Sequence, residues 1–86
     1  MIQINYSKKF IRQYSKHERN LQLEIKVKVE IFKNTKNHKS LKVHKLHGKW
    51  KNYYSFNINY KDIIMFKYID KNSVILMALG DHSIYE

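Results

Sequence analysis

The chain has 86 residues and no cysteine, which limits it to one domain and excludes a disulfide framework or a thiolate metal site. Its 17 lysines and arginines oppose seven acidic residues, so the formal net charge is +10 and polyanions are attracted. No apolar run is long enough for a transmembrane helix, and the polar N-terminus lacks the apolar core of a signal peptide. We therefore expect a cytoplasmic protein with no membrane contact.

The positive charge is concentrated in the middle of the chain. Between Ile31 and Lys61 there are eight lysines and no acidic residue, and the same stretch holds three of the five histidines. An AT-rich genome, which favours lysine codons, accounts for part of the lysine content but explains the missing acids less well. We expect this stretch to carry a surface for a polyanionic partner.

The N-terminus predicts a strand followed by a helix. Apolar and polar residues alternate over Ile2–Tyr6, which is typical of a half-buried strand. Ser7 then suits the N-cap of a helix over Lys8–His17. Three apolar side chains follow at helical spacing, namely Phe10, Ile11 and Tyr14.

The next segment, Asn20–Asn34, supports two interpretations. Six apolar residues alternate strictly with polar ones, which by period and β-branching favours a strand: Leu21, Leu23, Ile25, Val27, Val29 and Ile31. A helix would instead form one apolar stripe and leave Leu23 and Val27 on its flanks. That stripe consists of Leu21, Ile25, Val29 and Phe32.

The second half of the chain predicts a three-stranded meander after a polar loop at Asn34–Ser40. The strands are expected at Trp50–Ile58, Asp62–Ile69 and Ser73–Leu79, with turns between them. In the first strand, Tyr53, Ser55 and Asn57 share the open face, opposite the core-facing Tyr54, Phe56 and Ile58. A strand, a helical region and a meander give an α+β fold with helices on one sheet face.

Several short motifs occur in a familiar order. HKLHG at His44–Gly48 precedes an aromatic strand (YYSFNINY) and the strand DIIMFKY, and the chain closes with Gly80-x-His82-x-x-Tyr85. In this order and spacing, over nearly the whole chain, the sequence resembles the RelE/ParE toxins, and within them the YafQ-like branch. The resemblance implies a strand, two antiparallel helices and a three-stranded antiparallel meander. It therefore implies that Asn20–Asn34 is helical.

The resemblance also implies an activity. Ribonucleases of this family cleave mRNA, usually on the ribosome, without a metal or other cofactor, and are neutralised by a cognate acidic antitoxin. The RNA 2′-hydroxyl attacks the adjacent phosphate. Such chemistry needs a base for the hydroxyl, an acid for the leaving 5′-oxygen and a cation for the charge that develops at phosphorus.

Carried over by position, four residues are the expected catalytic set. His82 is the expected general acid, and His44 is expected to act as the base or to orient the phosphate. Tyr85 resembles the C-terminal tyrosine that stacks on RNA. Lys61 would stabilise the phosphorane, although a lysine offers a point charge where an arginine offers a planar fork.

Three positions depart from the family pattern. Asn57 replaces a histidine that is frequent in the YafQ-like branch, and Lys61 replaces an aspartate. Ile63 replaces the arginine that many members of the superfamily keep at the phosphate. These departures leave the activity open.

The expected RNA contacts flank the catalytic set and interleave lysines with aromatic side chains, which stack on unpaired bases. They are Lys45, His47, Lys49, Lys51, Tyr53 and Asn57. The alternative for each is a solvated basic or polar surface. A zinc site at His44 and His47 is disfavoured, because no carboxylate or cysteine lies near them in the sequence.

Two other functions stay open. The chain could be a non-nucleolytic binding toxin, like the ParE gyrase inhibitors, or a catalytically decayed relative. The histidines favour the nuclease, whereas Ile63 favours the binding toxin. If the resemblance is accidental, a generic basic nucleic-acid-binding domain remains.

Overall fold

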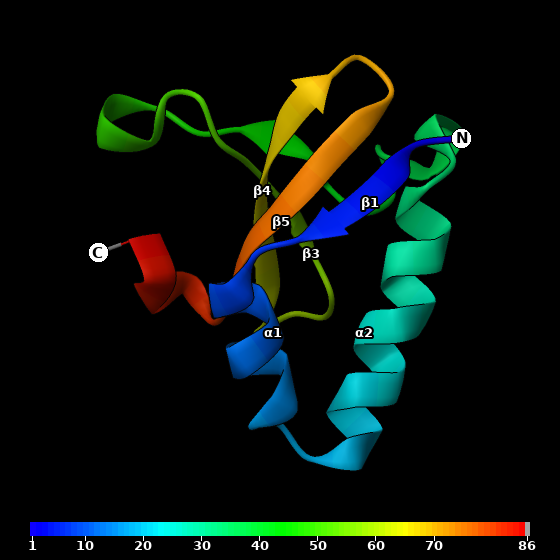
Figure 1. The fold of residues 1–86 in the computed structure, drawn as a ribbon, viewed down its shortest axis with the longest axis vertical. Helices are drawn as coiled ribbons and strands as arrows, with labels where there is room; N and C mark the ends of the chain where they lie inside the picture. The colour runs from blue at the N-terminus through cyan, green and yellow to red at the C-terminus, as the bar shows by residue number, and fades with distance from the viewer. Residues whose placement is uncertain (86) are drawn as a thin grey trace.

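One five-stranded sheet forms the centre of the molecule in the computed structural model, which describes residues 1–85. The strand order is β1-β5-β4-β3-β2; β1 runs parallel to β5, and the other neighbours are antiparallel. Two helices stand on one side of the sheet (Figure 1). The elements are β1 (Gln3–Tyr6), α1 (Lys8–Ser15), α2 (Arg19–Phe32), β2 (His44–Lys45), β3 (Tyr54–Asn57), β4 (Ile63–Asp70) and β5 (Ser73–Gly80), with short 3-10 helices η1 (Thr35–Asn37), η2 (Gly48–Trp50) and η3 (His82–Tyr85).

The predicted α+β architecture is confirmed, with one addition. The expected strand, helix pair and antiparallel meander correspond to β1, α1 with α2, and β3 to β5. The two-residue β2 extends the meander at its outer edge by pairing His44 with Ser55 and Lys45 with Tyr54. This addition places the HKLHG motif directly beside β3. None of the helices in the described residues is long and apolar enough to span a membrane.

The first helix starts where the sequence predicts. The Ser7 hydroxyl accepts a hydrogen bond from the Phe10 backbone N–H at 3.0 Å, which satisfies one of the free donors of the first turn. The same hydroxyl donates to the Met77 carbonyl of β5, so the cap also ties α1 to the sheet. Phe10 is the buried residue of this helix.

The segment after it is a helix, so the interpretation of Asn20–Asn34 as a strand is wrong. The predicted stripe faces the core, with Ile25, Val29 and Phe32 buried. Phe32 packs between Phe56 and Phe66, with ring centroids 4.4 Å and 4.9 Å away. Each large apolar side chain buried in this way contributes about 1.5–3 kcal/mol. That long-range packing outweighs the local alternation.

The predicted strand at Trp50–Ile58 is shorter in the structure. Residues 48–50 form the 3-10 turn η2 because Gly48 adopts a φ of 65°, a left-handed conformation that glycine tolerates. The strand proper then begins at Tyr54. Consequently Trp50 belongs to a loop that can fold back over the sheet.

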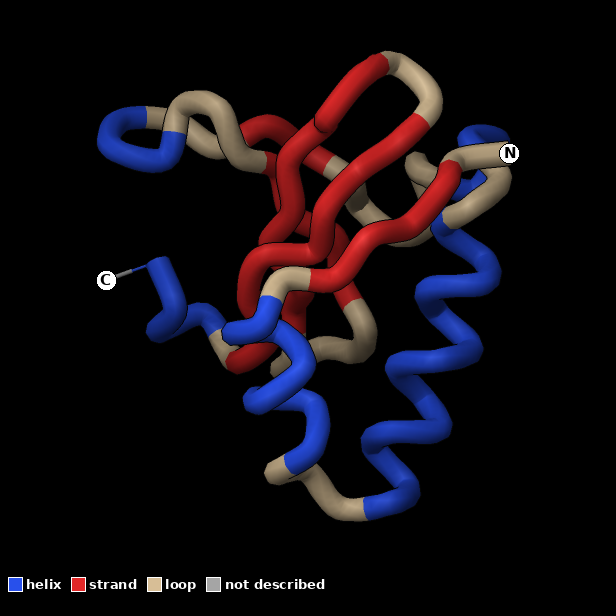
Figure 2. Tube along the Cα trace, viewed as in Figure 1, coloured by secondary structure: helices blue, strands red, loops and turns tan. Residues whose placement is uncertain are grey.

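The sheet has a hydrophobic cluster on each face. The larger cluster lies under the helices and includes Phe32, Phe56, Phe66 and Leu76. The smaller one, here called the second cluster, consists of Leu46, Met65 and Ala78 with Trp50, Tyr53, Ile84 and Tyr85 packed against it. Figure 2 shows where the helices lie relative to the strands of the sheet. The second cluster therefore occupies the face that α1 and α2 leave free.

Candidate functional site

Two short 3-10 helices cover the second cluster and bring the C-terminus to the β2–β3 region. The indole Nε1 of Trp50 in η2 donates a hydrogen bond of 2.8 Å to the Tyr85 carbonyl in η3. In Figure 1 the β2–β3 connection and η3 lie on the same side of the sheet, away from α2. The HKLHG motif and the closing Gly-x-His-x-x-Tyr motif thus meet in space.

Four residues from these segments form a continuous hydrogen-bonded chain. The Tyr85 hydroxyl donates to Ser55 Oγ at 2.8 Å, and Ser55 Oγ lies 3.2 Å from His44 Nε2. On its other side, His44 Nδ1 lies 2.8 Å from the Lys42 carbonyl. Ser55 is fully buried, whereas His44 is exposed and Tyr85 is half-buried.

The partners fix the direction of every bond in this chain. A carbonyl can only accept, so His44 Nδ1 must carry the hydrogen that points at Lys42. In a neutral imidazole Nε2 is then an acceptor, and the Ser55 hydroxyl donates to it. The Ser55 oxygen is left to accept from Tyr85. His44 is therefore held as a base whose Nε2 lone pair accepts a hydrogen bond from Ser55.

Backbone strain supports this arrangement. Lys42 has a φ of 56°, and it is the one non-glycine residue with a positive φ in the described part of the chain. Such a conformation is uncommon for a lysine and is frequently found at functional sites. Here it aims the Lys42 carbonyl at the His44 ring.

The predicted general acid, His82, lies beside the ring of Tyr85. The rings of His82 and Tyr85 meet at a centroid distance of 6.0 Å in an edge-on geometry. His82 is exposed and starts η3 next to Asp81. Tyr85 therefore lies between the two predicted catalytic histidines, with His82 at its ring and His44 connected through its hydroxyl.

Charge at this end of the sheet centres on Asp81. Hydrogen bonds from the Ser83 hydroxyl and backbone N–H, followed by the nearby charges of Lys61 and His82, hold the pKa of Asp81 below its usual value. Lys61 is exposed in the β3–β4 turn and lines the same surface hollow as Gly80 and Asp81. The predicted phosphorane cation, Lys61, is thus close enough to Asp81, the residue before His82, for its charge to lower the pKa of that carboxyl.

Part of the expected RNA-binding set lies beside the second cluster. The side chains of Lys45, His47, Lys49 and Lys51 are exposed, and Lys49 Nζ stands 5.4 Å from the centroid of the Trp50 ring. Tyr53 is half-buried, with Trp50 edge-on at 5.5 Å and Lys67 Nζ at 5.7 Å from its ring. Lys49 and Lys67 therefore lie beside the aromatic rings of the second cluster, whereas Lys45 pairs with Tyr54 of the larger cluster and lies on the other face.

The structure also shows where Ile63 and Asn57 lie, two of the residues that depart from the family pattern. Ile63 is buried and pairs with Asn57 and Gly80 across the sheet, so a hydrophobic side chain fills the position of the expected arginine. Asn57 is half-buried, and its backbone N–H donates to the Leu41 carbonyl. Neither supplies a charge to the site.

The sequence predicts His44, His82 and Tyr85 but misses what connects them. Ser55 reads as a polar residue on the wet face of a strand, yet it is the buried bridge of the hydrogen-bonded chain. Trp50 is expected within a strand, whereas in the structure its indole hydrogen-bonds the Tyr85 carbonyl and so anchors η3. A serine inside an aromatic strand is the signal that was available for Ser55, since hydroxyls buried among apolar side chains need hydrogen-bond partners.

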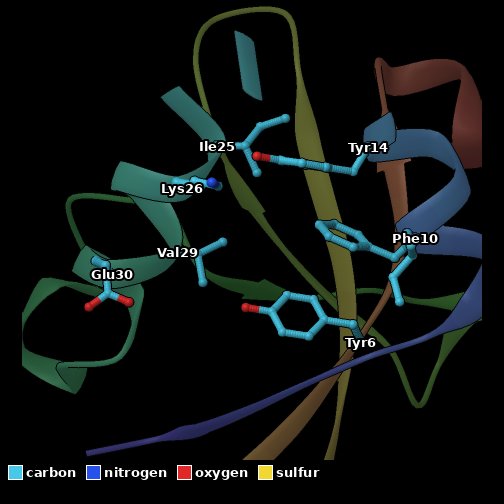
Figure 3. Close-up of a pocket in the computed structure, with 8 residues that line it drawn as sticks. Tyr6, Phe10, Tyr14, Ile25, Lys26, Val29 and Glu30 are labelled. Atoms are coloured by element: carbon cyan, nitrogen blue, oxygen red, sulfur yellow. The ribbon is translucent and has the colours of Figure 1, made fainter. Parts of the chain in front are cut away.

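A second hollow lies on the opposite face, between the helices. It has a volume of about 410 Å³ and is walled mostly by apolar side chains, with Lys26 and Glu30 of α2 beside them (Figure 3). The apolar lining consists of Tyr6, Phe10, Ile11, Tyr14, Ile25 and Val29. This groove, here called the helix groove, contains no histidine and is separated from the second cluster by the sheet. In residues 1–85 no group of three or more histidine, cysteine or acidic side chains is arranged to hold a metal ion.

Comparisons with known proteins agree with this fold. No family model matches the chain, and no curated protein matches it. A conserved hypothetical protein of Helicobacter pylori has a solution structure similar to this chain, with a TM-score of 0.72, 23% identity and coverage of 96% of this chain and 97% of that one. A YafQ mutant from E. coli gives a TM-score of 0.72 at 17% identity, covering 99% and 98% of the two chains.

A third solved structure, the heterotetrameric YoeB–YefM toxin–antitoxin complex of Staphylococcus aureus, contains a chain with a TM-score of 0.72 at 17% identity, covering 95% of this chain and 98% of that one. The resemblance to the RelE/ParE toxins is thereby confirmed at the level of the fold. At these identities the match is one of architecture, and the residues of the site have to be argued from their own geometry.

Proposed function

We propose that this protein is the toxin of a type II toxin–antitoxin pair and cleaves mRNA, bound to the ribosome, without a metal ion. The observation that carries the proposal is the meeting of His44, Tyr85 and His82 on the helix-free face of the sheet. The exposed lysines Lys42 and Lys45 flank His44 along the chain. A base, an acid and a cationic surface are what cleavage by an adjacent 2′-hydroxyl needs.

The roles follow from position. His44 serves as the base, and His82 protonates the leaving 5′-oxygen. Lys61, whose charge acts on Asp81 beside His82, offsets the charge at phosphorus. Lys45, Lys49 and Lys51 contact RNA phosphates, while Tyr53 and Tyr85 offer ring faces to bases.

The proposed partner is a small antitoxin with an acidic, amphipathic segment. A formal charge of +10 favours an acidic partner, and the helix groove offers an apolar surface. The S. aureus match was solved as a toxin–antitoxin complex, which supports the same kind of partner here.

The decisive experiment is His82→Gln, with toxicity on expression and primer extension of cellular mRNA as measurements. Glutamine keeps a hydrogen-bond donor but transfers no proton, so cleavage should fall by about 10²–10⁴-fold. The matched control is His38→Gln, because His38 stacks on Phe32 outside the site. Thermal unfolding of both variants checks that the fold is kept. Undiminished cleavage by the His82 variant would remove His82 from the acid role.

One observation favours a second candidate, a toxin that binds its target without cleaving RNA. Ile63 is only 1% exposed, so an apolar core side chain stands where the family resemblance implies an arginine, and the one cation of β4, Lys67, lies against the Tyr53 ring. A wild-type protein that is toxic but produces no primer-extension stops, with or without ribosomes, would support this candidate.

A further inference from the structure

The least expected feature of the site is a serine that no solvent reaches. Ser55 is 0% exposed and lies in the middle of β3, opposite Met65 of β4 and His44 of β2. A buried hydroxyl is costly unless it is hydrogen-bonded. Ser55 has both of its bonds, and both go to residues of the proposed catalytic set.

These two bonds join residues that are 41 positions apart in the sequence, His44 and Tyr85. Ser55 accepts from the Tyr85 hydroxyl at 2.8 Å and donates to His44 Nε2 at 3.2 Å, while the Lys42 carbonyl holds the opposite ring nitrogen. Both ring nitrogens of His44 are thus engaged from within the protein. The hydroxyl of Tyr85, a half-buried residue, is the last group of the chain of bonds.

We infer that Ser55 is a positioning residue that couples Tyr85 to His44, so that the Tyr85 hydroxyl receives the proton of the attacking hydroxyl on behalf of His44. The inference rests on the proposed function and adds a path for the proton. A bond that Ser55 donates to Nε2 leaves that nitrogen no free approach from solvent. The Tyr85 oxygen, at the end of the chain of bonds, is then the group that accepts a proton from a substrate hydroxyl.

The steps balance as follows. The RNA 2′-hydroxyl gives its proton to the Tyr85 oxygen, the Tyr85 proton moves to Ser55 Oγ, and the Ser55 proton moves to His44 Nε2. The 2′-oxygen forms its bond to phosphorus, and the bond from phosphorus to the 5′-oxygen breaks. His82 gives a proton to that 5′-oxygen. One proton has entered at Tyr85, one has left from His82, and His44 ends as an imidazolium that still donates to the Lys42 carbonyl.

The kinetic test uses Ser55→Ala, Tyr85→Phe and the double variant. Each single change breaks the same path, so each should lower the rate of RNA cleavage by about 100-fold, the order expected for a lost proton transfer. The double variant should be no slower than either single variant, because residues that act as one unit are non-additive. The acidic limb of the rate–pH profile, which reports a neutral base, should disappear in all three. Ser73→Ala is the matched control, since Ser73 is also a buried serine in the sheet but bonds Asp70.

A second measurement does not depend on cleavage. The imidazole ¹⁵N resonances of His44 should show a hydrogen on Nδ1, and the Nε2 resonance should move in Ser55→Ala. It should move in the same direction, by less, in Tyr85→Phe, because Tyr85 polarises Ser55. It should stay in place in Ser73→Ala.

The outcomes distinguish the inference about Ser55 from the proposed function. RNA cleavage by Ser55→Ala at the wild-type rate would overturn the inference. Additive losses of the cleavage rate in the double variant would also overturn it. A His44 resonance that ignores both changes would also overturn it, whatever the cleavage assay gives. A wild-type protein that cuts no RNA, with His44 responding to Ser55→Ala, would contradict the proposed function and leave the coupling by Ser55 standing.

Discussion

Asp81 is the residue that fixes the turn between the last strand and the proposed acid. Its carboxylate accepts hydrogen bonds from the backbone N–H of Ser83 at 2.9 Å and from the Ser83 hydroxyl. These bonds, with the charges of Lys61 and His82, lower the pKa of Asp81. The charged form is therefore the one that holds η3 in position.

We predict that acid releases this turn. A carboxylate whose folded-state pKa is depressed stabilises the structure above its unfolded pKa, about 3.9 for aspartate, and that stabilisation is lost as the pH falls through the lower folded-state value. Trp50 is the single tryptophan and bonds the Tyr85 carbonyl, so its fluorescence should change in this range.

The control for this titration is a second aspartate. Asp70 also has a lowered pKa, caused first by the Asn72 backbone N–H, but it lies in the β4–β5 turn. Asp81→Asn should abolish the acid change in Trp50 fluorescence, and Asp70→Asn should keep it. A change that survives Asp81→Asn would assign the transition to another group.

Residue identity alone predicts part of the site. His44, His82 and Tyr85 are recognisable because they stand in short motifs. The role of Ser55 depends on the pairing of β2 with β3 and on where η3 docks, and neither is encoded near Ser55 in the sequence. Long-range hydrogen bonds of this kind are set by tertiary structure, so the local sequence can indicate that Ser55 needs partners but not which residues they are.

At the scale of elements, the approach of η3 to the sheet depends on Gly80. A Cβ atom built at Gly80 would stand 2.6 Å from Cγ2 of Ile84, closer than two carbon atoms can approach. Gly80 also pairs with Ile63 across the sheet, which restrains its backbone. Ile84 therefore packs over a position where no side chain fits.

We predict that Gly80→Ala moves η3 away from the second cluster. The displaced Ile84 carries Tyr85 with it, so the bonds from Tyr85 to Ser55 and from Trp50 to Tyr85 should weaken. Cleavage should fall at least about tenfold, while the thermal unfolding midpoint should shift by only a few degrees, because a turn at the chain end contributes little to the core.

The rescue of this variant is Gly80→Ala combined with Ile84→Ala, which removes the Cγ2 atom from the contact. Trp50 fluorescence should return toward the wild-type value in the double variant. Equal fluorescence and cleavage in Gly80→Ala and the wild type would mean that η3 accommodates the methyl group and that the close approach is not required.

The helix α2 shows how an apolar pattern can indicate the wrong type of element. The alternation of Leu21 through Ile31 indicates a strand, yet Leu23 and Val27 are 46% and 56% exposed on a helix. The period of a short segment records which residues are apolar and not which of them are buried. The deciding contacts come from Phe56 and Phe66, which lie more than 20 residues further along the chain. The helix was predicted from the resemblance to the RelE/ParE toxins and not from the alternation of apolar residues.

For the whole molecule, the arrangement separates two surfaces. The second cluster lies on one face of the sheet, together with the proposed catalytic residues His44 and His82. The helix groove lies on the other face, between α1 and α2 (Figure 3). Exposed apolar side chains beside a groove mark a protein-binding surface more often than an RNA-binding one. An acidic, amphipathic segment could bury its apolar side there while its acids meet the positive field of the chain.

We predict that the two functions can be separated by mutation. Ile11 lines the helix groove and is 53% exposed, so Ile11→Asp should keep the fold. A buried, unpaired carboxylate at the interface is costly and would also repel acidic groups. Capture of the proposed antitoxin from the native cell at low salt should fall at least about tenfold, while the proposed cleavage of ribosome-bound mRNA by the purified protein should stay at the wild-type rate. Leu23→Asp is the matched control, because Leu23 is a comparably exposed apolar residue that does not line the groove. Full antitoxin capture by Ile11→Asp, or equal losses in both variants, would place the partner elsewhere on the surface.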